Sequence, residues 1–181
     1  MSFSQSTSAA LTDDAVRCKQ AWAALDEVPD PEVPALSVCD LGIVRAVRAD
    51  GAGLEIVLTP TYSGCPATEV ISQNVRSAID AAGLGPARVT LQRAPAWTTD
   101  WISESGRSKL TAYGIAPPGP TVRTDGSFPI HFYGRGSQAR LNCPRCNSGN
   151  TERLSAFGST ACKALYRCLS CREPFEHFKP I

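Results

Sequence analysis

Hydrophobic residues recur with helical spacing near the start of the chain. The apolar positions lie three or four residues apart, as on one face of a helix: Ala15, Cys18, Trp22 and Leu25. Thr12 suits the N-cap of this helix, because its hydroxyl can accept a hydrogen bond from an exposed backbone N–H group. Three prolines in residues 28–34 must end the helix. We predict that residues 1–11, which are rich in serine, form a disordered lead-in.

The next pattern is an alternation of apolar and polar residues. It runs through residues 43–49 and again through residues 54–58, and each run predicts a strand. Residues 50–53 read Asp-Gly-Ala-Gly, which predicts a tight turn because glycine readily adopts a positive φ. The two strands should therefore form a hairpin.

A second helix is predicted directly after the hairpin. Pro66 fits its first turn, and Gly83 can end it. The residues between them form a stripe with a helical period: Val70, Ile71, Asn74, Val75, Ala78 and Ile79. Residues 88–93 alternate again and predict a third strand, and residues 103–113 predict a short helix that stops at Gly114. The order α-β-β-α-β-α predicts an α+β protein whose first part is a small α/β layer domain, a mixed sheet with helices packed on it.

Prolines and glycine mark the end of this domain. Residues 116–120 read Ala-Pro-Pro-Gly-Pro, a stiff sequence that fits neither a helix nor a strand. We therefore predict an α/β domain over residues 12–116 and a linker over residues 117–140, with one short strand near residues 130–133. Residues 141–181 form a cysteine-rich unit of a different kind.

Composition narrows the possible functions. The 181 residues carry 18 Lys and Arg against 17 Asp and Glu, a net charge of +1, which does not favour a nucleic-acid-binding protein. The sequence has no apolar run long enough for a transmembrane helix and no signal peptide at its start, so we expect a cytoplasmic protein without membrane partners. In that compartment its eight cysteines are better suited to metal binding or thiol chemistry than to disulfides.

Four cysteines in the last part of the chain have the spacing of a metal site. They form two Cys-x-x-Cys pairs, separated by 21 residues: Cys143 with Cys146, and Cys168 with Cys171. Two such pairs complete a tetrahedral shell of four thiolates, for which zinc is the usual ion, and iron or a redox dithiol are the alternatives. The intervening residues predict strands near 154–157 and 164–167, with a third at 174–178. Cys162 is expected to be a buried apolar residue, and His177 is expected not to bind the metal.

Cys65 is a second candidate for chemistry. It lies between a predicted strand and the N-terminus of the best predicted helix, where the helix dipole and exposed N–H groups favour a thiolate. From the residues alone, Cys65 is equally well explained as a reactive thiol or as a small buried residue. Asp30, Glu32 and Asp40 either stabilise turns or supply a general acid and base. Trp97 is more simply explained by packing than by ligand binding.

The order of these motifs resembles a known family. Asp30-Pro31-Glu32, Asp40-Leu41-Gly42 and Thr61-x-x-x-Cys65-Pro66 are similar to the motifs of the SufT-like iron–sulfur assembly domain. Longer stretches resemble the PaaD family, which is encoded together with the multicomponent phenylacetyl-CoA epoxidase of aerobic phenylacetate degradation. These stretches are residues 59–69, 95–101, 113–118 and 157–168, and the resemblance covers about residues 12–179.

This resemblance implies an accessory protein that is not itself an enzyme. Such a protein assists the assembly of a metal centre, iron–sulfur or di-iron, in the epoxidase, and its partners are the oxygenase or reductase subunits. Cys65 corresponds to the functional thiol, which holds iron or an iron–sulfur cluster transiently. The neighbouring motif positions are Asp30, Glu32, Asp40 and Thr61, and the zinc ligands are Cys143, Cys146, Cys168 and Cys171.

Several alternatives stay open. The chain could be a stably bound structural or regulatory subunit of the epoxidase. A nucleic-acid-binding module is disfavoured by the low net charge. A thiol oxidoreductase would need a second thiol, and Cys39 is the candidate, although a small core residue is the simpler interpretation. A homodimer could form through exposed sheet edges.

Overall fold

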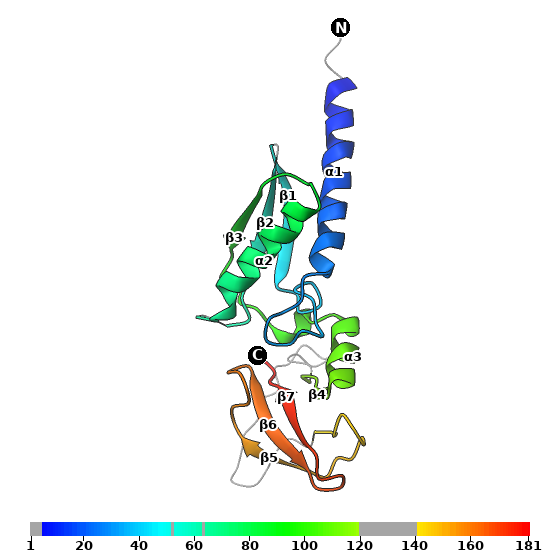
Figure 1. The fold of residues 1–181 in the computed structure, drawn as a ribbon, viewed down its shortest axis with the longest axis vertical. Helices are drawn as coiled ribbons and strands as arrows, with labels where there is room; N and C mark the ends of the chain where they lie inside the picture. The colour runs from blue at the N-terminus through cyan, green and yellow to red at the C-terminus, as the bar shows by residue number, and fades with distance from the viewer. Residues whose placement is uncertain (1–4, 52, 63, 120–140) are drawn as a thin grey trace. The chain divides into compact units, whose positions relative to one another are not determined.

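The computed structural model of the chain describes residues 5–51, 53–62, 64–119 and 141–181 (Figure 1). The backbone divides into two compact units, Met1–Trp97 and Thr98–Ile181, each of which is treated by itself below. Within the described residues, none of the helices combines the length and the apolar character needed to cross a membrane.

The first unit is built on a three-stranded mixed sheet in the order β1-β2-β3 (Figure 1). Its strands are β1 (Val44–Asp50), β2 (Gly53–Leu58) and β3 (Ala87–Leu91). β1 and β2 form the predicted antiparallel hairpin, and β3 runs parallel to β2. Helix α1 (Gln5–Asp26) packs against β1, α2 (Ala67–Ala81) packs against β3, and the two helices also contact each other.

The core of this unit lies between the sheet and the two helices. Alternate residues of β2 and every third or fourth residue of α2 are fully buried, as expected for one face of a strand and one stripe of a helix. They are Leu54, Ile56, Leu58, Ile71, Val75 and Ile79. From α1, Ala21 and Leu25 complete the core.

Helix α1 differs from its prediction at its start and on its buried face. It begins at Gln5 rather than at Thr12, so it includes most of the segment that was expected to be disordered. The buried face centres on Ala21, while Trp22, predicted to be inside, is 38% exposed. The spacing of apolar residues misplaced this face: it favoured Trp22, which has the larger apolar side chain, whereas the fold buries its neighbour Ala21.

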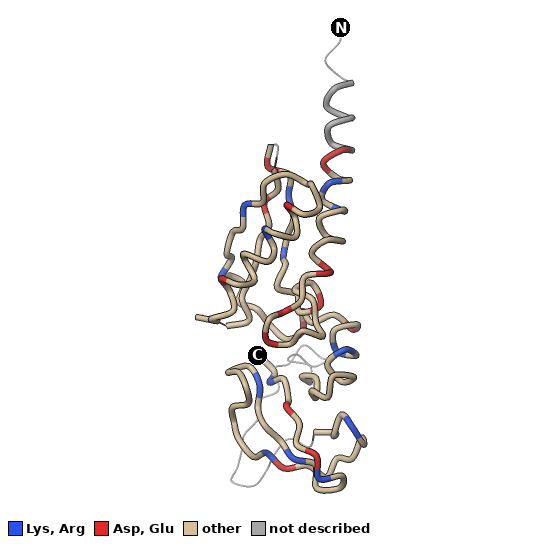
Figure 2. The backbone as a smooth tube through the Cα atoms, viewed as in Figure 1, with Lys and Arg blue, Asp and Glu red and all other residues tan. Residues whose placement is uncertain are grey.

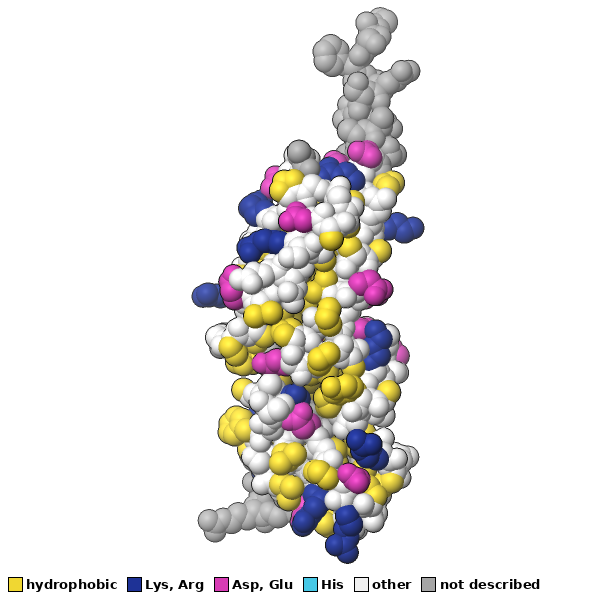
Figure 3. All heavy atoms as spheres, in the orientation of Figure 1, with side chains coloured by type: hydrophobic (Ala, Val, Ile, Leu, Met, Phe, Trp, Pro, Cys, Tyr) yellow, Lys and Arg dark blue, Asp and Glu magenta, His cyan; other side chains and the backbone are white. Residues whose placement is uncertain are grey.

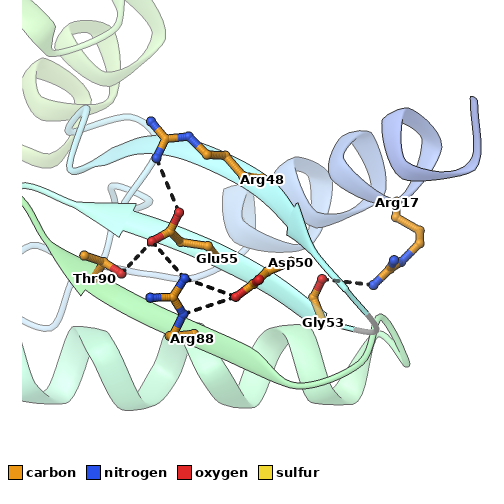
Figure 4. Close-up of polar contacts among 7 residues, drawn as sticks. All are labelled: Arg17, Arg48, Asp50, Gly53, Glu55, Arg88 and Thr90. Carbon is orange, nitrogen blue, oxygen red and sulfur yellow. Dashed lines mark hydrogen bonds and ion pairs between the residues drawn. The ribbon is translucent and has the colours of Figure 1, made fainter. Parts of the chain in front are cut away.

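Arg17 of α1 holds the turn of the hairpin in place (Figure 4). Its guanidinium donates to the backbone oxygen of Gly53 at 3.2 Å, the contact drawn in Figure 4. It also donates to the backbone oxygens of Gly51 and Leu84, at 3.4 and 3.3 Å. At Gly53, a β-carbon would collide with the backbone oxygen of Pro86, so only glycine allows the hairpin to approach the loop before β3 this closely.

Charged residues occupy the sheet face opposite the helices (Figure 4). The Glu55 carboxylate accepts a hydrogen bond from the Thr90 hydroxyl at 2.9 Å and pairs with Arg48 and Arg88, each at 3.3 Å. The hydrogen bond from Thr90 and the two guanidinium groups lower the pKa of Glu55 below its ordinary value. Polar groups thus bridge the three strands on the side that no helix covers.

The second unit contains a four-stranded sheet in the order β4-β7-β6-β5. Its strands are β4 (Ile115–Ala116), β5 (Thr151–Ser155), β6 (Lys163–Cys168) and β7 (Pro174–Phe178). The last three form the predicted antiparallel ribbon, whereas β4 pairs with β7 in parallel and was not predicted.

Helix α3 (Glu104–Tyr113) belongs to this second unit and has the predicted ends. Ser103 accepts a hydrogen bond from the backbone N–H of Gly106, and Gly114 adopts a left-handed φ of 93°. Because β4 directly follows α3 and pairs with β7, residues 98–116 lie with the C-terminal sheet. The boundary between residues 116 and 117 stays a prediction, and residues 120–140 of the predicted linker lie outside the described residues.

Candidate metal centre and thiol site

The two Cys-x-x-Cys pairs lie at one end of the β5-β6-β7 ribbon. The Sγ atoms of Cys143, Cys146, Cys168 and Cys171 all lie within 4.8 Å of one another. The Cys143–Cys171 distance is 3.8 Å, and the Cys146–Cys168 distance is 3.5 Å. In a tetrahedral shell with Zn–S bonds of about 2.3 Å, the sulfurs are about 3.8 Å apart. The four thiols therefore already have the spacing of a zinc site.

The two pairs have the same local backbone structure. The amide of Cys143 donates to the oxygen of Ser148 at 2.9 Å, and the amide of Cys168 donates to the oxygen of Glu173 at 3.0 Å. The residue after each second cysteine is left-handed, with φ of 57° at Asn147 and 67° at Arg172. This repeated turn brings both thiols of each pair to the same side of the chain.

The backbone also stabilises the charged form of one thiol. The amide of Cys171 points at Cys168 Sγ from 3.4 Å, and together with the Ser170 amide it lowers the pKa of Cys168 to about 6. A deprotonated sulfur is the form that binds a metal ion. Cys143 and Cys168 are buried while Cys146 is exposed, so the site is at the surface.

These residues fit a structural zinc ion. Four thiolates would complete its shell, so the ion would cross-link the ribbon and offer no open position for a substrate. Among the described residues, the cluster consists of the four cysteines and does not include His177. Cys162 is buried beside the Thr160 hydroxyl, at 3.0 Å, which agrees with its interpretation as a core residue.

The second predicted site lies at one end of the three-stranded sheet. Three loops meet there because β1 begins where the parallel strands β2 and β3 end. The amide of Thr59 donates to Ile43, the amide of Gln92 donates to Leu58, and the indole N–H of Trp97 donates to Leu41, at 2.8–2.9 Å. Trp97 is buried, so the packing interpretation of this residue is confirmed.

The motif carboxylates shape the loop before β1. Asp30 Oδ1 accepts the amides of Glu32 and Val33 at 2.9 and 2.8 Å. Asp40 Oδ2 accepts the amide of Ser37 at 3.2 Å, and the Ser37 hydroxyl accepts the amide of Asp40. Both aspartates are buried, which agrees with the turn-stabilising interpretation.

Cys65 lies in the loop between β2 and α2. Its amide donates to Tyr62 at 3.3 Å, and its carbonyl accepts the amide of Thr68 at 3.2 Å. The thiol is half-buried, and Pro66 separates it from the first residue of α2. Thr61 and Glu32, also half-buried, lie on two of the three loops that meet at this end of the sheet.

Cys39 is unsuited to be a redox partner of Cys65. Burial and the carboxylates of Asp26 and Asp40 raise its pKa to about 12. A thiol that stays protonated is a poor nucleophile in disulfide exchange, so the interpretation as a core residue is favoured.

Sequence reasoning missed an ion pair in the second unit. The ammonium group of Lys163 is buried and lies 3.0 Å from the carboxylate of Glu176. The two residues are not directly opposite in the ladder, because Lys163 pairs with Phe178 and Glu176 with Leu165. Only the register of β6 and β7, which cannot be read from the sequence, would have indicated it.

Comparison with known proteins assigns families to both parts of the chain. Residues 19–91 match the family described as iron-sulfur cluster assembly protein, and residues 129–179 match the PaaD zinc beta ribbon domain. An Escherichia coli (strain K12) protein, provisionally named as a subunit of 1,2-phenylacetyl-CoA epoxidase, is 50% identical over 160 residues. That alignment covers 88% of this chain and 91% of the relative. The chain belongs to the PaaD family.

The first part of this PaaD-family chain has further relatives. A Porphyromonas gingivalis (strain ATCC BAA-308 / W83) protein named Fe-S protein maturation auxiliary factor is 32% identical over 88 residues. That match covers 48% of this chain and 83% of the relative. The crystal structure of a domain of unknown function from Bacillus anthracis superimposes with a TM-score of 0.52 at 24% identity, over 55% of this chain and 96% of that one. The predicted family and the α+β class with a C-terminal ribbon are thus confirmed.

Proposed function

We propose that this protein assists the assembly of a metal centre of phenylacetyl-CoA epoxidase. Cys65 receives iron or an iron–sulfur cluster transiently and passes it to an oxygenase or reductase subunit. The four ribbon cysteines hold a structural zinc ion. The protein itself catalyses no step of the epoxidation.

One combination of observations carries this proposal. A domain that matches the iron–sulfur assembly family is joined to a ribbon that matches the PaaD zinc beta ribbon domain, and 88% of the chain aligns with a protein provisionally named as an epoxidase subunit. Among the described residues of the first unit, two half-buried thiols lie in the loops at this end of the sheet, Cys39 and Cys65. Burial and the carboxylates of Asp26 and Asp40 keep the Cys39 thiol protonated, which leaves Cys65 as the better candidate. A soft thiolate donor at a loop is suited to holding iron loosely enough to release it.

The isolated protein offers a direct test of the thiol. We expect that anaerobic reconstitution with ferrous iron and sulfide loads the wild type with iron, and that Cys65→Ser loses this iron while keeping one zinc per chain. Cys18→Ser is the matched control, since Cys18 is also half-buried but lies on α1. Equal iron in Cys65→Ser and wild type, measured by elemental analysis after desalting, would rule out Cys65 as the binding residue.

A stably bound subunit is the second candidate, because the relative from Escherichia coli is itself named as a subunit of the epoxidase. It predicts that the chain co-purifies with the active epoxidase at a fixed ratio. An assembly factor would instead be absent from the purified active enzyme.

A further inference from the structure

The outer edge of β3 can accept another strand. Among the described strands, β3 pairs only with β2 and forms one edge of the first sheet (Figure 1). The amide of Leu54 donates to the oxygen of Pro86 at 3.0 Å, and the amide of Gln92 donates to the oxygen of Leu58 at 2.8 Å. Since alternate residues of a strand bond to the same neighbour, the even-numbered residues of β3 face β2. The residues whose N–H and C=O groups face outward are Ala87, Val89 and Leu91.

This edge lacks the usual protection against pairing. Sheet edges that stay unpaired are commonly interrupted by a bulge or a proline, or lined with charges. The opposite edge strand, β1, has a shift in register between Val44 and Ala46. β3 keeps an unbroken register with β2 over all five of its residues. Its one charged residue is Arg88, and the tube in Figure 2 is otherwise tan along this strand.

The Arg88 side chain lies over its own sheet rather than along the edge (Figure 4). Its guanidinium donates to Asp50 Oδ2 from Nε at 3.2 Å and from Nη2 at 3.1 Å. The same Nη2 lies 3.3 Å from the carboxylate of Glu55. Because Asp50 belongs to β1 and Glu55 to β2, both contacts draw the charge away from the outer edge. A strand that arrives at β3 therefore does not have to displace it.

The outward residues of β3 also carry apolar side chains that the helices cover only in part. They pair with residues of β2 that are fully buried on the face covered by the helices, so they lie on that same face. Leu91 is nevertheless 46% exposed, and Ala87 and Val89 are half-buried. Val70, near the start of α2, is 45% exposed. Figure 3 shows apolar side chains at the surface of the first unit near this end of α2.

We propose that a second copy of this chain pairs with β3 in antiparallel orientation, with Val89 on the two-fold axis. This axis brings Val89 opposite Val89 of the second copy, and Ala87 opposite Leu91. These are the residues whose backbone groups face outward, so each pair exchanges both of its hydrogen bonds. A two-fold axis at any other residue of β3 would leave part of the strand unpaired or would place inward-facing groups at the contact.

The facing side chains are compatible with this register. On the face covered by the helices, valine meets valine and the small Ala87 meets the larger Leu91, which forms one apolar strip. On the other face, Arg88 meets Thr90 of the second copy, so no like charges lie directly opposite each other. A strand of another protein could form the same backbone hydrogen bonds. The match of every position with its symmetry mate, however, is specific to a second copy.

This inference goes beyond the proposed function and does not depend on it, but it constrains the thiol site. Cys65 follows the carboxyl end of β2, which runs parallel to β3. Antiparallel pairing places these ends of the two copies at opposite ends of the combined sheet. Because strands of five residues are about 17 Å long, the two Cys65 thiols would not hold one metal centre together. Each copy would bind its own.

Sedimentation velocity of the full-length, zinc-loaded chain, over about three decades of concentration, tests the dimer. A pairing of this length buries less area than a standard interface, so we expect a reversible dimer in the micromolar range. Leu91→Lys places a charge against Ala87 of the second copy and should raise the dimer Kd at least about tenfold. Val16→Lys is the matched control, because Val16 is 53% exposed on α1, and its Kd should stay within about twofold of wild type.

Cross-linking tests the register. With Val89 on the axis, Val89→Cys faces itself at a distance that a disulfide can span, and mild oxidation should link the two copies. Thr90→Cys faces Arg88 instead and should not form this link. The wild type, with its eight native cysteines, gives the background.

Three results would overturn the β3 dimer. The wild type could stay monomeric over the whole range, including the case in which an epoxidase subunit covers β3 instead. Leu91→Lys could dimerise as tightly as the wild type, or Val89→Cys and Thr90→Cys could cross-link equally. Iron loading separates these results from failure of the proposed function: Leu91→Lys should load as much iron per chain as the wild type. Full iron in Cys65→Ser would refute the thiol site and leave the dimer unaffected.

Discussion

The buried side chain of His177 should make the stability of the ribbon depend on pH. It is only 7% exposed, its ring lies edge-on to Tyr166, and its Nε2 atom has no hydrogen-bond partner among the described residues. Burial, with a smaller effect of Lys179, lowers its pKa to about 4. The folded protein therefore keeps the ring neutral where the unfolded chain, with a pKa near 6.5, takes up a proton.

Replacing this histidine by phenylalanine should stabilise the ribbon. His177→Phe keeps the ring contact and removes a buried polar atom without a partner, which we expect to gain about 1 kcal/mol at pH 7.5. This stabilisation by His177→Phe should increase as the pH falls below about 6.5, because in the wild type His177 then takes up a proton only in the unfolded chain, which favours unfolding. The increase should stop near pH 4, where His177 is protonated in the folded protein too. Between pH 7.5 and 5.5, the difference in the free energy of unfolding between His177→Phe and wild type should increase by about 1 kcal/mol.

Hydrogen exchange of the β6 and β7 amides in the zinc-loaded proteins measures this difference. Comparing wild type with His177→Phe cancels the pH dependence that both share through the zinc thiolates. A gain that stayed constant with pH would mean that His177 titrates equally in the folded and unfolded protein.

At the scale of elements, local signals predicted most of the structure. The hairpin turn follows from Gly51, which has a positive φ, and α3 follows from the capping residues Ser103 and Gly114, since each of these residues acts on its own neighbours. Gly53 is required instead by the distant Pro86. Two features depend on distant partners and were missed or misplaced. The two-residue strand β4 exists only by pairing with β7, and the buried face of α1 depends on which side chain fits against α2.

The hairpin turn allows a test at this scale. Gly53→Ala places a methyl group against the backbone oxygen of Pro86, an atom that cannot move without shifting β3. We expect a loss of about 1–3 kcal/mol from the stability of the first unit, measured by exchange of the β1 and β2 amides. Gly119→Ala, where a β-carbon meets open space, should leave the exchange of these amides unchanged. Equal stability of the two variants would show that the hairpin can move away from the loop before β3.

At the scale of the whole molecule, the two sites were predictable to different degrees. Spacing alone identified the four cysteines that the fold brings together, because two Cys-x-x-Cys pairs need only a hairpin between them to meet. The carboxylates were ambiguous in the sequence, because only the fold shows that Asp30 and Asp40 accept backbone amides.

Removing zinc should affect the two units differently. A structural zinc contributes roughly 10–16 kcal/mol of apparent binding energy, so a chelator should unfold residues 141–181. The first unit has its own core of β2 and α2 residues, and its amides should remain protected. Hydrogen exchange with and without a strong chelator checks this, and protection of β6 that survives complete zinc loss would show that the ribbon folds without metal.

We have proposed that Cys65 delivers a metal centre to the epoxidase. The most direct measurement is the metal occupancy of epoxidase purified from cells that produce wild-type protein, Cys65→Ser, Cys18→Ser, or none of these. We predict full occupancy with wild type and Cys18→Ser, and occupancy with Cys65→Ser as low as in cells lacking the protein. Full occupancy with a stably folded, zinc-loaded Cys65→Ser protein would show that Cys65 is not needed to deliver the metal centre.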